Sequence, residues 1–568
     1  MLLIAAEREL APAQRIWGTG GWVVPEQREA LDWLALGRLL GWEVSLANAD
    51  RPAGALAGRR WIVAALDPDA LSDEIVAQLG AVLRAEPVLL IARAGAAEGR
   101  LASLAGAARS GERFAGRELR WRGPGPPAQQ RSQVDVDCER LALAPGTEVW
   151  AELEGAPIAV ARASGRGRVV TLGFHPSGAR DADGAFTALA KRLLVWGALG
   201  PVAWLDLAGA LVLRMDDPGG AQNVHSASWC HPKLGEAAWG EIGASLRRRR
   251  ARLSIAYVAG WVDDGDAARG ALRVDGCEVA RRPGAVHPSP AVRYADLAGH
   301  APGTVHDYAS EFRGIQQLRA AGLAEVELHG YTHMHPDGAA WASAPDRYQA
   351  VAWYRELGAP ARAVLAAAPP EQHPLALGLA AFERWFATRP AALVCPGDQW
   401  TDEVALRALD LGFELVSSYY LGLRDGARLC WAQHVCAPYL DLADPAWFAG
   451  ELPVVGYFHD RDAVLHGTAW IEAQLERWET AGARRFLDLR ELAAALRLRL
   501  RAVEDAATPL ALHVGEAAPG ALVRPVPIGL RAGASPLPSQ LPVSMRGREL
   551  SLEVETLAPG VGRVLLQD

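Results

Sequence analysis

The sequence lacks the features that mark several large classes of protein. Its six cysteines include no Cys-x-x-Cys pair. This spacing argues against a disulfide framework and against a zinc ribbon, and it favours reduced thiols. The formal net charge of −8 argues against general affinity for nucleic acids. We therefore expect neither a disulfide-rich scaffold nor a nucleic-acid partner.

Export and membrane signals are also missing. Residues 1–12 have no basic n-region and only a very short apolar run, so we expect no secretory signal and a cytoplasmic protein. Residues 193–213 carry Asp206 as their only charge. Pro201 and several glycines interrupt this stretch, so we expect a helix end and a strand there and no membrane span.

The first 200 residues predict an α/β domain. Strand patterns alternate with amphipathic helices at 26–41, 71–85 and 183–198, and residues 157–174 predict a hairpin. This alternation predicts a parallel sheet covered on both faces, of the Rossmann-like or flavodoxin-like type. The arrangement resembles the class I glutamine-amidotransferase-like domain. It has no cysteine or serine in a nucleophile elbow, so we expect a structural or substrate-presenting role.

The rest of the chain predicts two further domains. Residues 205–500 contain a succession of about seven strand–helix units, including a helix at 347–358, and these predict a distorted (β/α)7 barrel. Such barrels place their sites at the carboxyl ends of the strands. A long insertion at 267–310 is either functional or disordered. Residues 505–568 change to short alternating runs, which predict a small β domain.

The stretch AEVELHGYTHMH at 324–335 is the first candidate site. Its alternating residues predict a short strand that Gly330 ends, with His329 and His333 four residues apart just beyond. Two imidazoles at this spacing can meet one metal ion, zinc above all. A pair of surface or hydrogen-bonded histidines is the alternative.

The stretch ALVLRMDDPG at 210–219 is the second candidate site. An apolar run ends in Asp216 and Asp217, followed by proline and glycine. A strand cannot bury two carboxylates at its tip cheaply, so such a pair is solvated, metal-bound or catalytic. Together the two stretches supply one carboxylate and two histidines, enough for a catalytic zinc ion with an open position.

The order of Met-Asp-Asp and then His-Gly-Tyr-Thr-His resembles the polysaccharide deacetylases, carbohydrate esterase family four. The resemblance covers about residues 205–500. It implies that Asp217, His329 and His333 are the ligands of a divalent metal, most of all Zn²⁺. It also implies a deacetylase that acts on N-acetyl groups of an amino sugar or glycan.

The same resemblance implies the remaining catalytic groups. Asp216 would be the general base, and His459, at the end of PVVGYFH, the general acid, oriented by Asp460 or Asp462. A metal ion lowers the pKa of a water molecule and polarises the acyl oxygen. A positioned acid contributes about 10²–10⁴-fold to the rate.

The third motif of the family, Arg-x-Pro-Tyr, is only partly present. The chain has Val-Cys-Pro-Gly at 394–397, in which Pro396 matches while arginine and tyrosine are missing. Arg214 is a candidate replacement, because it lies two residues before Asp216 and hence on the same face of the strand. The departure suggests a substrate unlike chitin or peptidoglycan oligomers.

Several residues near these motifs are candidate substrate contacts, because aromatic rings stack on sugar faces and carboxylates bind hydroxyl groups. Each tryptophan could equally belong to the core, and His225 and His231 are further candidates of the same kind. The predicted contacts are Trp261, Asp263, Tyr331, His335, Pro396, Gly397 and Trp400.

Three functions remain open from the sequence. The first is metal-dependent deacetylation of an amino sugar or glycan. The second is hydrolysis of a small non-carbohydrate amide, which the absence of an export signal favours. The third is a catalytically silent protein that binds carbohydrate. The expected partner in each case is a small molecule or a glycan, and the sequence carries no signal of an oligomeric state.

Overall fold

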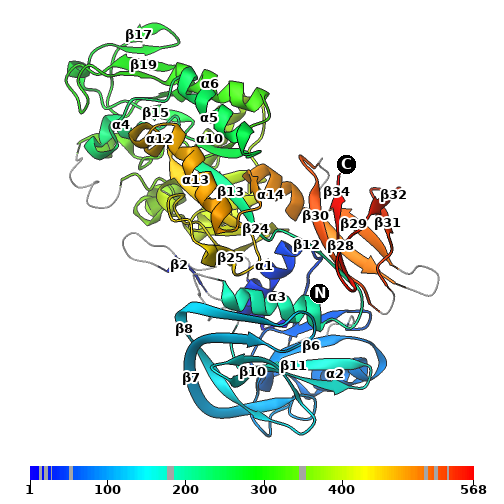
Figure 1. Ribbon diagram of the computed structural model, residues 1–568. Helices are drawn as coiled ribbons and strands as arrows, with labels where there is room; N and C mark the ends of the chain where they lie inside the picture. Colours follow the sequence, from blue (N-terminus) through cyan, green and yellow to red (C-terminus); the bar gives the residue numbers. More distant parts are fainter. Residues whose placement is uncertain are drawn as a thin grey trace.

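The computed structural model shows a mixed α/β protein in three adjoining parts (Figure 1). The residues described are 1–11, 16–17, 24–26, 28–49, 56–175, 184–343, 353–504, 510–516, 522–533 and 536–567.

A nine-stranded sheet organises the N-terminal part, drawn blue and cyan in Figure 1. Its parallel half, in spatial order, contains β4 (Ser45–Asn48), β1 (Leu2–Ala5), β5 (Trp61–Ala64), β6 (Leu89–Arg93) and β11 (Gly167–Leu172). Its antiparallel half contains β10 (Ala156–Ser164), β9 (Glu148–Leu153), β7 (Ala107–Trp121) and β8 (Ala128–Leu143). A short pair, β2 (Ile16–Trp17) and β3 (Val24–Pro25), lies outside this sheet.

Helices cover both faces of the parallel half. The predicted helices correspond to α1 (Glu29–Leu39), α2 (Asp73–Ala85) and α3 (Ala185–Gly197). Leu2 packs in the core that contains α2, whereas Leu3 packs in the core that contains α1 and α3. Because neighbouring side chains of a strand point to opposite faces, the two cores lie on opposite sides of the sheet. The predicted hairpin is β10–β11.

A second nine-stranded sheet carries the candidate site. Its parallel strands are β13 (Ala210–Asp216), β14 (Leu253–Tyr257), β21 (Ala324–Leu328), β22 (Ala392–Val394), β23 (Leu415–Ser417), β26 (Val454–His459) and β27 (Arg485–Leu487). The antiparallel strands β24 (Tyr420–Asp425) and β25 (Arg428–Cys436) complete it.

The sequence predicts a distorted (β/α)7 barrel, and the described strands form a mixed sheet that does not close into a continuous barrel. Its order runs from β25 through β24, β23, β22, β21, β14 and β13 to β26, and in the described part of the chain one isolated bridge, Tyr439 to Tyr457, joins the two ends. The sequence FELVSSYYL at 413–421 predicts one strand. In the structure this stretch breaks after Ser417, and the chain continues as the antiparallel hairpin β24–β25.

Helices pack against this sheet and share one core with it. They are α5 (Glu236–Arg248), α6 (Tyr308–Ala320), α10 (Pro374–Phe386), α11 (Asp402–Asp410), α12 (Asp460–His466) and α13 (Ala469–Ala481). A further helix, α14 (Leu489–Leu496), packs in the core that extends to the N-terminal part. Shorter helices are α4 (Gln222–His225), α7 (Gly338–Ser343) and α9 (Arg362–Ala367).

The helix predicted at 347–358 is wrong where it can be checked. Residues 353–358 form turns, and 347–352 lie outside the described residues. Trp353 and Glu356 of this segment pack on the loop after β21, whereas Leu357 is buried in the core of the sheet.

The insertion forms two small sheets at the outer end of the molecule, at the top of Figure 1. One pairs β15 (Gly260–Val262) with β18 (Val286–Pro288). The other contains β17 (Cys277–Val279), β16 (Leu272–Val274), β19 (Val292–Ala295) and β20 (Val305–Asp307). Trp261, Tyr294 and Tyr308 pack together in its core.

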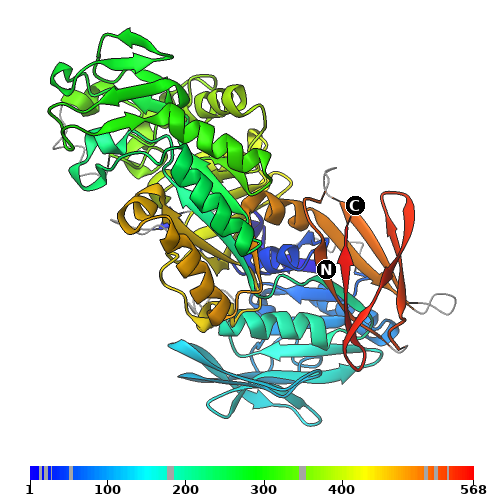
Figure 2. The same cartoon turned by 45° about the horizontal axis from the view of Figure 1, so that its top comes forward.

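Two four-stranded sheets form the C-terminal part, drawn orange and red beside the N-terminal sheet in Figure 2. One contains β12 (Val202–Leu205), β30 (Val526–Arg531), β34 (Val561–Leu566) and β33 (Glu555–Ala558). The other contains β28 (Leu498–Val503), β29 (Ala511–Glu516), β31 (Gln540–Met545) and β32 (Arg548–Glu553). Strands β12 and β28 precede the predicted boundary at 505. No helix of the described chain is long and apolar enough to cross a membrane.

Candidate metal and catalytic site

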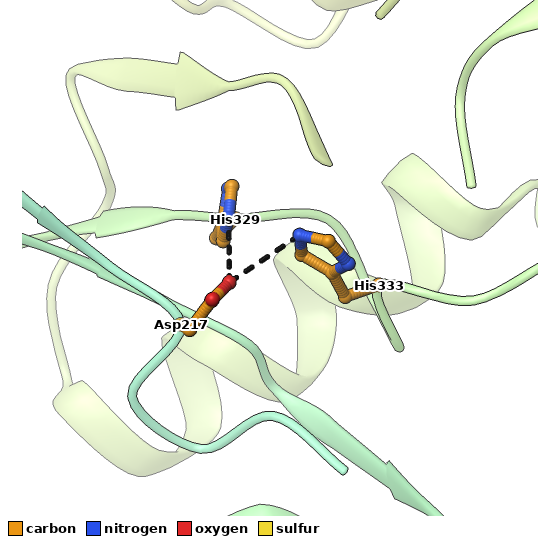
Figure 3. A group of neighbouring side chains, drawn as sticks. All are labelled: Asp217, His329 and His333. Atoms are coloured by element: carbon orange, nitrogen blue, oxygen red, sulfur yellow. Dashed lines mark ion pairs between the residues drawn. The ribbon is translucent and has the colours of Figure 1, made fainter. Parts of the chain in front are cut away.

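The carboxyl ends of β13 and β21 bring three predicted ligands together. Asp217 follows β13 directly, and His329 and His333 follow β21. The Nε2 atoms of both histidines lie 3.4 Å from Oδ1 of Asp217 (Figure 3). One ligand atom of each residue lies within 4.8 Å of the others, and all three residues are buried.

These distances suit a shared metal ion better than direct hydrogen bonds. A charge-assisted N–H···O bond spans about 2.7–2.9 Å. Two ligand atoms about 2.0–2.1 Å from one tetrahedral zinc ion are about 3.3–3.4 Å apart. The observed 3.4 Å matches the second value.

The surroundings leave the histidine Nε2 atoms available as ligands. Nδ1 of His329 lies 3.1 Å from the carbonyl oxygen of Val394. When Nδ1–H donates to this oxygen, the lone pair lies on Nε2, as in most histidine–metal sites. Nδ1 of His333 is buried without a hydrogen-bond partner among the described residues, whereas Nε2 of its ring faces Asp217.

The ionisation states of Asp217 and His333 also favour a cation. Burial alone would raise the pKa of Asp217, but the imidazoles of His329, His333 and His459 hold it well below its usual range. The carboxylates of Asp217 and Asp216 raise the pKa of His329 against the effect of burial, and a bound cation would oppose this shift. Burial, with a contribution from His329, lowers the pKa of His333 to about 4. An ionised carboxylate and a neutral imidazole are the forms that bind metals. The residues present therefore fit a divalent cation such as Zn²⁺.

The backbone at the site is strained. Asp217 (φ 81°) and His333 (φ 59°) both adopt the left-handed region, which few residues other than glycine occupy. Such strain costs about 1–3 kcal/mol for each residue and concentrates at functional sites. Gly330 (φ 71°) leaves no room for a side chain, because a Cβ atom there would overlap the carboxylate of Glu356.

Glu356 shapes the loop that carries His333. Its buried carboxylate accepts hydrogen bonds from the backbone N–H groups of Tyr331 (2.9 Å), Thr332 (3.0 Å) and His333 (3.2 Å). It also accepts one from the Thr332 hydroxyl group (3.0 Å). Burial raises the pKa of Glu356 to about 7, although these hydrogen bonds oppose the shift. The sequence analysis missed this residue, since it lies in the segment predicted as a helix.

We expect Glu356→Gln to lower the free energy of unfolding by roughly 1–3 kcal/mol and to weaken metal binding, because an amide group leaves at least one buried N–H unpaired. Thermal melts and metal titrations measure the two effects. Glu327→Gln is the matched control, since Glu327 is also buried but accepts a bond from Ala392 N (2.7 Å). Equal metal affinity in both variants would contradict a role for Glu356 in the metal loop.

Arg214 is buried beside Asp216, on the same strand. Its Nε and Nη2 atoms donate to the two oxygens of the Asp216 carboxylate at 2.9 and 2.8 Å. Nη1 donates to Oγ of Ser417 at 2.9 Å, and Nη2 lies 3.3 Å from Asp398. Arg214 therefore holds the Asp216 carboxylate through two hydrogen bonds, as expected of a candidate replacement for the missing motif arginine.

Removing this guanidinium should be costly. We expect Arg214→Leu to destabilise the fold by about 3–5 kcal/mol, the range seen when one partner of a buried ion pair is removed. Thermal melts of the purified variant measure this loss. An Arg214→Leu variant as stable as the original protein would contradict a role for the Arg214–Asp216 pair in the fold.

His459 lies at the N-terminus of α12. Its Nδ1 lies 3.4 Å from Oδ2 of Asp462, which also accepts the His459 backbone N–H at 2.8 Å. Of the two predicted orienting residues, Asp462 is therefore the one in contact. Asp460 instead pairs with His231 Nε2 (3.2 Å) and Lys233 Nζ (2.5 Å). Burial alone would lower the pKa of His459. Asp462 and the carboxylates of Asp217 and Asp216 outweigh this effect and raise the pKa to about 9.

These groups line one cavity of about 400 Å³. The residues that share it with Asp216, Asp217, His329, His333 and His459 are Gln222, Ser226, Ser228, Trp229, Trp353, Tyr354, Arg355, Cys395, Gly397, Asp398, Tyr419 and Tyr439. The sequence analysis singled out Gly397 among them but missed Asp398 and the aromatic rings. Asp398 follows Pro-Gly just after β22, much as Asp216 and Asp217 precede Pro-Gly after β13, and this parallel could have indicated it.

Most of the predicted substrate contacts do not line this cavity. Trp261 is fully buried in the insertion core. Asp263 pairs with Arg281 (2.9 Å), and Trp400 stacks on Trp431 with ring centroids 4.3 Å apart.

The remaining predicted contacts have structural surroundings as well. The half-buried Tyr331 packs against the core of the second nine-stranded sheet. Nε2 of His335 lies 3.3 Å from the Pro360 carbonyl oxygen, and Pro396 lies directly beside Gly330. His225 contacts Trp341, with ring centroids 4.3 Å apart, and lies outside the cavity lining. Local sequence context could not separate core aromatic residues from those around the cavity.

Comparisons with known proteins give limited guidance. No family model and no curated protein matches the chain. The structure is similar to that of Agd3, a carbohydrate deacetylase, with 11% identity, a TM-score of 0.42 and coverage of 100% of this chain and 99% of that chain.

Other similar structures cover only part of the chain. A cytoplasmic protein from Salmonella typhimurium LT2 has 15% identity and a TM-score of 0.22, over 30% of this chain and 86% of that chain. A β-galactosidase from Bacillus circulans sp. alkalophilus has 13% identity and a TM-score of 0.24, over 32% of each chain. Because the identities and TM-scores are this low, the functional proposal rests on the geometry of the site and not on the similarity.

Proposed function

We propose that this protein is a metal-dependent hydrolase that removes N-acetyl groups from an amino sugar or glycan. One observation carries the proposal: the ligand atoms of Asp217, His329 and His333 converge on one point. Asp216 and His459 line the same cavity as these ligands. A cation site with a base and an acid beside it suits hydrolysis of an amide.

The three ligands would hold a divalent cation, which supplies Lewis acidity for the acyl oxygen and the attacking water. Asp216 accepts the proton of the attacking water. Arg214 occupies one lone pair on each Asp216 oxygen, so further lone pairs remain to accept that proton. His459, whose pKa is raised to about 9, is protonated at neutral pH and donates to the leaving amine.

The aromatic rings around the cavity support a sugar as the substrate. Trp229, Trp353, Tyr354, Tyr419 and Tyr439 line it. Each combines an apolar face with a polar edge, which suits the faces and hydroxyl groups of a sugar ring. The lining also contains Ser226 and Ser228, which can hydrogen-bond to hydroxyl groups.

The test combines metal analysis with acetate release. We expect the purified protein to contain a divalent metal and to release acetate from N-acetylated sugars. Chelation should stop acetate release, and zinc should restore it. Metal without acetate release from sugars, but with release from small N-acetylated amides, would replace the sugar by another amide substrate. The absence of acetate release from both kinds of substrate would contradict the proposed hydrolase.

A further inference from the structure

A second cluster of metal-ligating side chains lies where the loop after β13 meets the insertion, apart from the site described above. Cys230, Asp296 and His306 each present a ligand atom within 4.8 Å of the others. Cys230 follows the short helical turn Ala227–Trp229, Asp296 follows β19, and His306 lies in β20. Asp296 and His306 are buried, and Cys230 is partly buried.

His306 has a polar atom that the protein does not use. Its side chain is fully buried, and Nε2 has no hydrogen-bond partner in the described part of the chain. A buried polar atom without a partner costs about 1–3 kcal/mol. A neutral imidazole carries a free lone pair on one of its two ring nitrogens. A bound cation would satisfy that lone pair on Nε2.

The neighbours of His306 can place the lone pair on Nε2. Nδ2 of Asn223 lies 2.7 Å from His306 Nδ1, and the Tyr308 hydroxyl group lies 2.6 Å from Oδ1 of Asn223 and 2.9 Å from the carbonyl oxygen of Gly220. Turning the Asn223 amide by 180° exchanges its nitrogen and oxygen at the same positions. In the turned orientation His306 Nδ1–H donates to Oδ1, Nδ2–H donates to the Tyr308 hydroxyl group, and that hydroxyl group donates to Gly220. A cation on Nε2 requires this turned orientation.

The carboxylate of Asp296 is held in place for the same point. It accepts the backbone N–H groups of Gly299 (2.6 Å) and Ala301 (3.2 Å) and lies 3.2 Å from Nη1 of Arg269. Two carboxylate oxygens can accept about four bonds, so capacity remains for a cation. The thiolate of Cys230 and the carboxylate of Asp296 supply two negative charges, which a dication balances, because the Arg269 guanidinium also pairs with Asp264.

We propose that Cys230, Asp296 and His306 bind a second divalent cation, zinc, with a structural role. Thiolate, imidazole and carboxylate together suit zinc better than the hard cations calcium and magnesium. The ion would join the loop after β13 to the insertion hairpin. Trp229, next to Cys230, lines the catalytic cavity and contacts the ring of His459 with centroids 4.9 Å apart. The second ion therefore orders one wall of the cavity.

Cobalt substitution of the full-length protein tests this site by itself. A thiolate bound to Co²⁺ gives a near-ultraviolet charge-transfer band, which a site made of two histidines and a carboxylate does not give. We expect this band in the cobalt-loaded protein, and we expect Cys230→Ser and His306→Ala to abolish it. Cys277→Ser is the matched control, since Cys277 is an exposed cysteine of the same insertion, and it should keep the band.

The outcomes separate this site from the catalytic one. His333→Ala should keep the thiolate band and lose the metal equivalent bound at the catalytic site. Cys230→Ser should lose the thiolate band together with the metal equivalent bound at the second site. Absence of the band from the cobalt-loaded protein, or its survival in Cys230→Ser, would overturn the second site. Neither result bears on whether Asp217, His329 and His333 bind a metal.

Discussion

Replacing Asp216 with asparagine is expected to lower kcat by about 10²–10⁴-fold, the usual contribution of a general base. The amide retains the shape of the side chain but cannot take a proton from the attacking water. Metal content should not change, because Asp216 is not one of the three converging ligands. Steady-state kinetics with an N-acetylated sugar and elemental analysis of the same preparation measure both quantities.

Asp398 provides the matched control for this prediction. It also approaches Arg214, at 3.3 Å, and lines the same cavity. Burial raises the pKa of Asp398, although Arg214 opposes the shift. Asp398→Asn removes a similar charge from the neighbourhood of Arg214 without removing the base, so kcat should fall far less. Equal losses in the two variants would assign both carboxylates to the charge balance of Arg214 and contradict a base role for Asp216.

Replacing His459 with glutamine should have the second large effect, and its size should depend on the leaving group. Loss of a positioned acid lowers kcat by about 10²–10⁴-fold for an amide, whose amine leaves only when protonated. An aryl acetate needs no proton on its leaving group, so its hydrolysis should change little. Comparing the two substrates with one variant separates proton donation from a general disturbance of the cavity. Equal losses for both substrates would contradict the acid role.

The pH dependence gives an independent measure of the same group. Asp462 and the neighbouring carboxylates raise the pKa of His459 from 6.5 to about 9. The acid form is therefore present below this pKa and is lost as the pH rises through it. A bound cation repels the imidazolium, so the alkaline limb of kcat/KM should lie between 6.5 and 9. Asp462→Asn should shift this limb to lower pH.

The motifs of the candidate site could be predicted because they depend on short stretches of sequence. An apolar run followed by Asp-Asp-Pro-Gly, and a short alternating run followed by His-Gly-Tyr-Thr-His, both place polar groups at strand ends. Arg214 could be paired with Asp216 because both lie on one strand with a period of two.

The remaining features depend on contacts between distant segments. Glu356 reaches the His333 loop from a segment whose apolar pattern resembles a helix, and its role is visible only in the hydrogen bonds it accepts. The hairpin β24–β25 begins at the break between β23 and β24, within a stretch whose sequence predicts one strand. The sequence around Trp261 and Trp229 does not tell which of them is a core residue. Packing shows that Trp261 belongs to the insertion core and Trp229 to the cavity wall.

Anomalous X-ray scattering from crystals of the protein at the zinc absorption edge tests the central claim most directly. The account predicts a peak between Oδ1 of Asp217 and the Nε2 atoms of His329 and His333, and loss of that peak in His333→Ala. Direct hydrogen bonds between Asp217 and the two imidazoles in zinc-treated crystals, with no peak at that position, would contradict it.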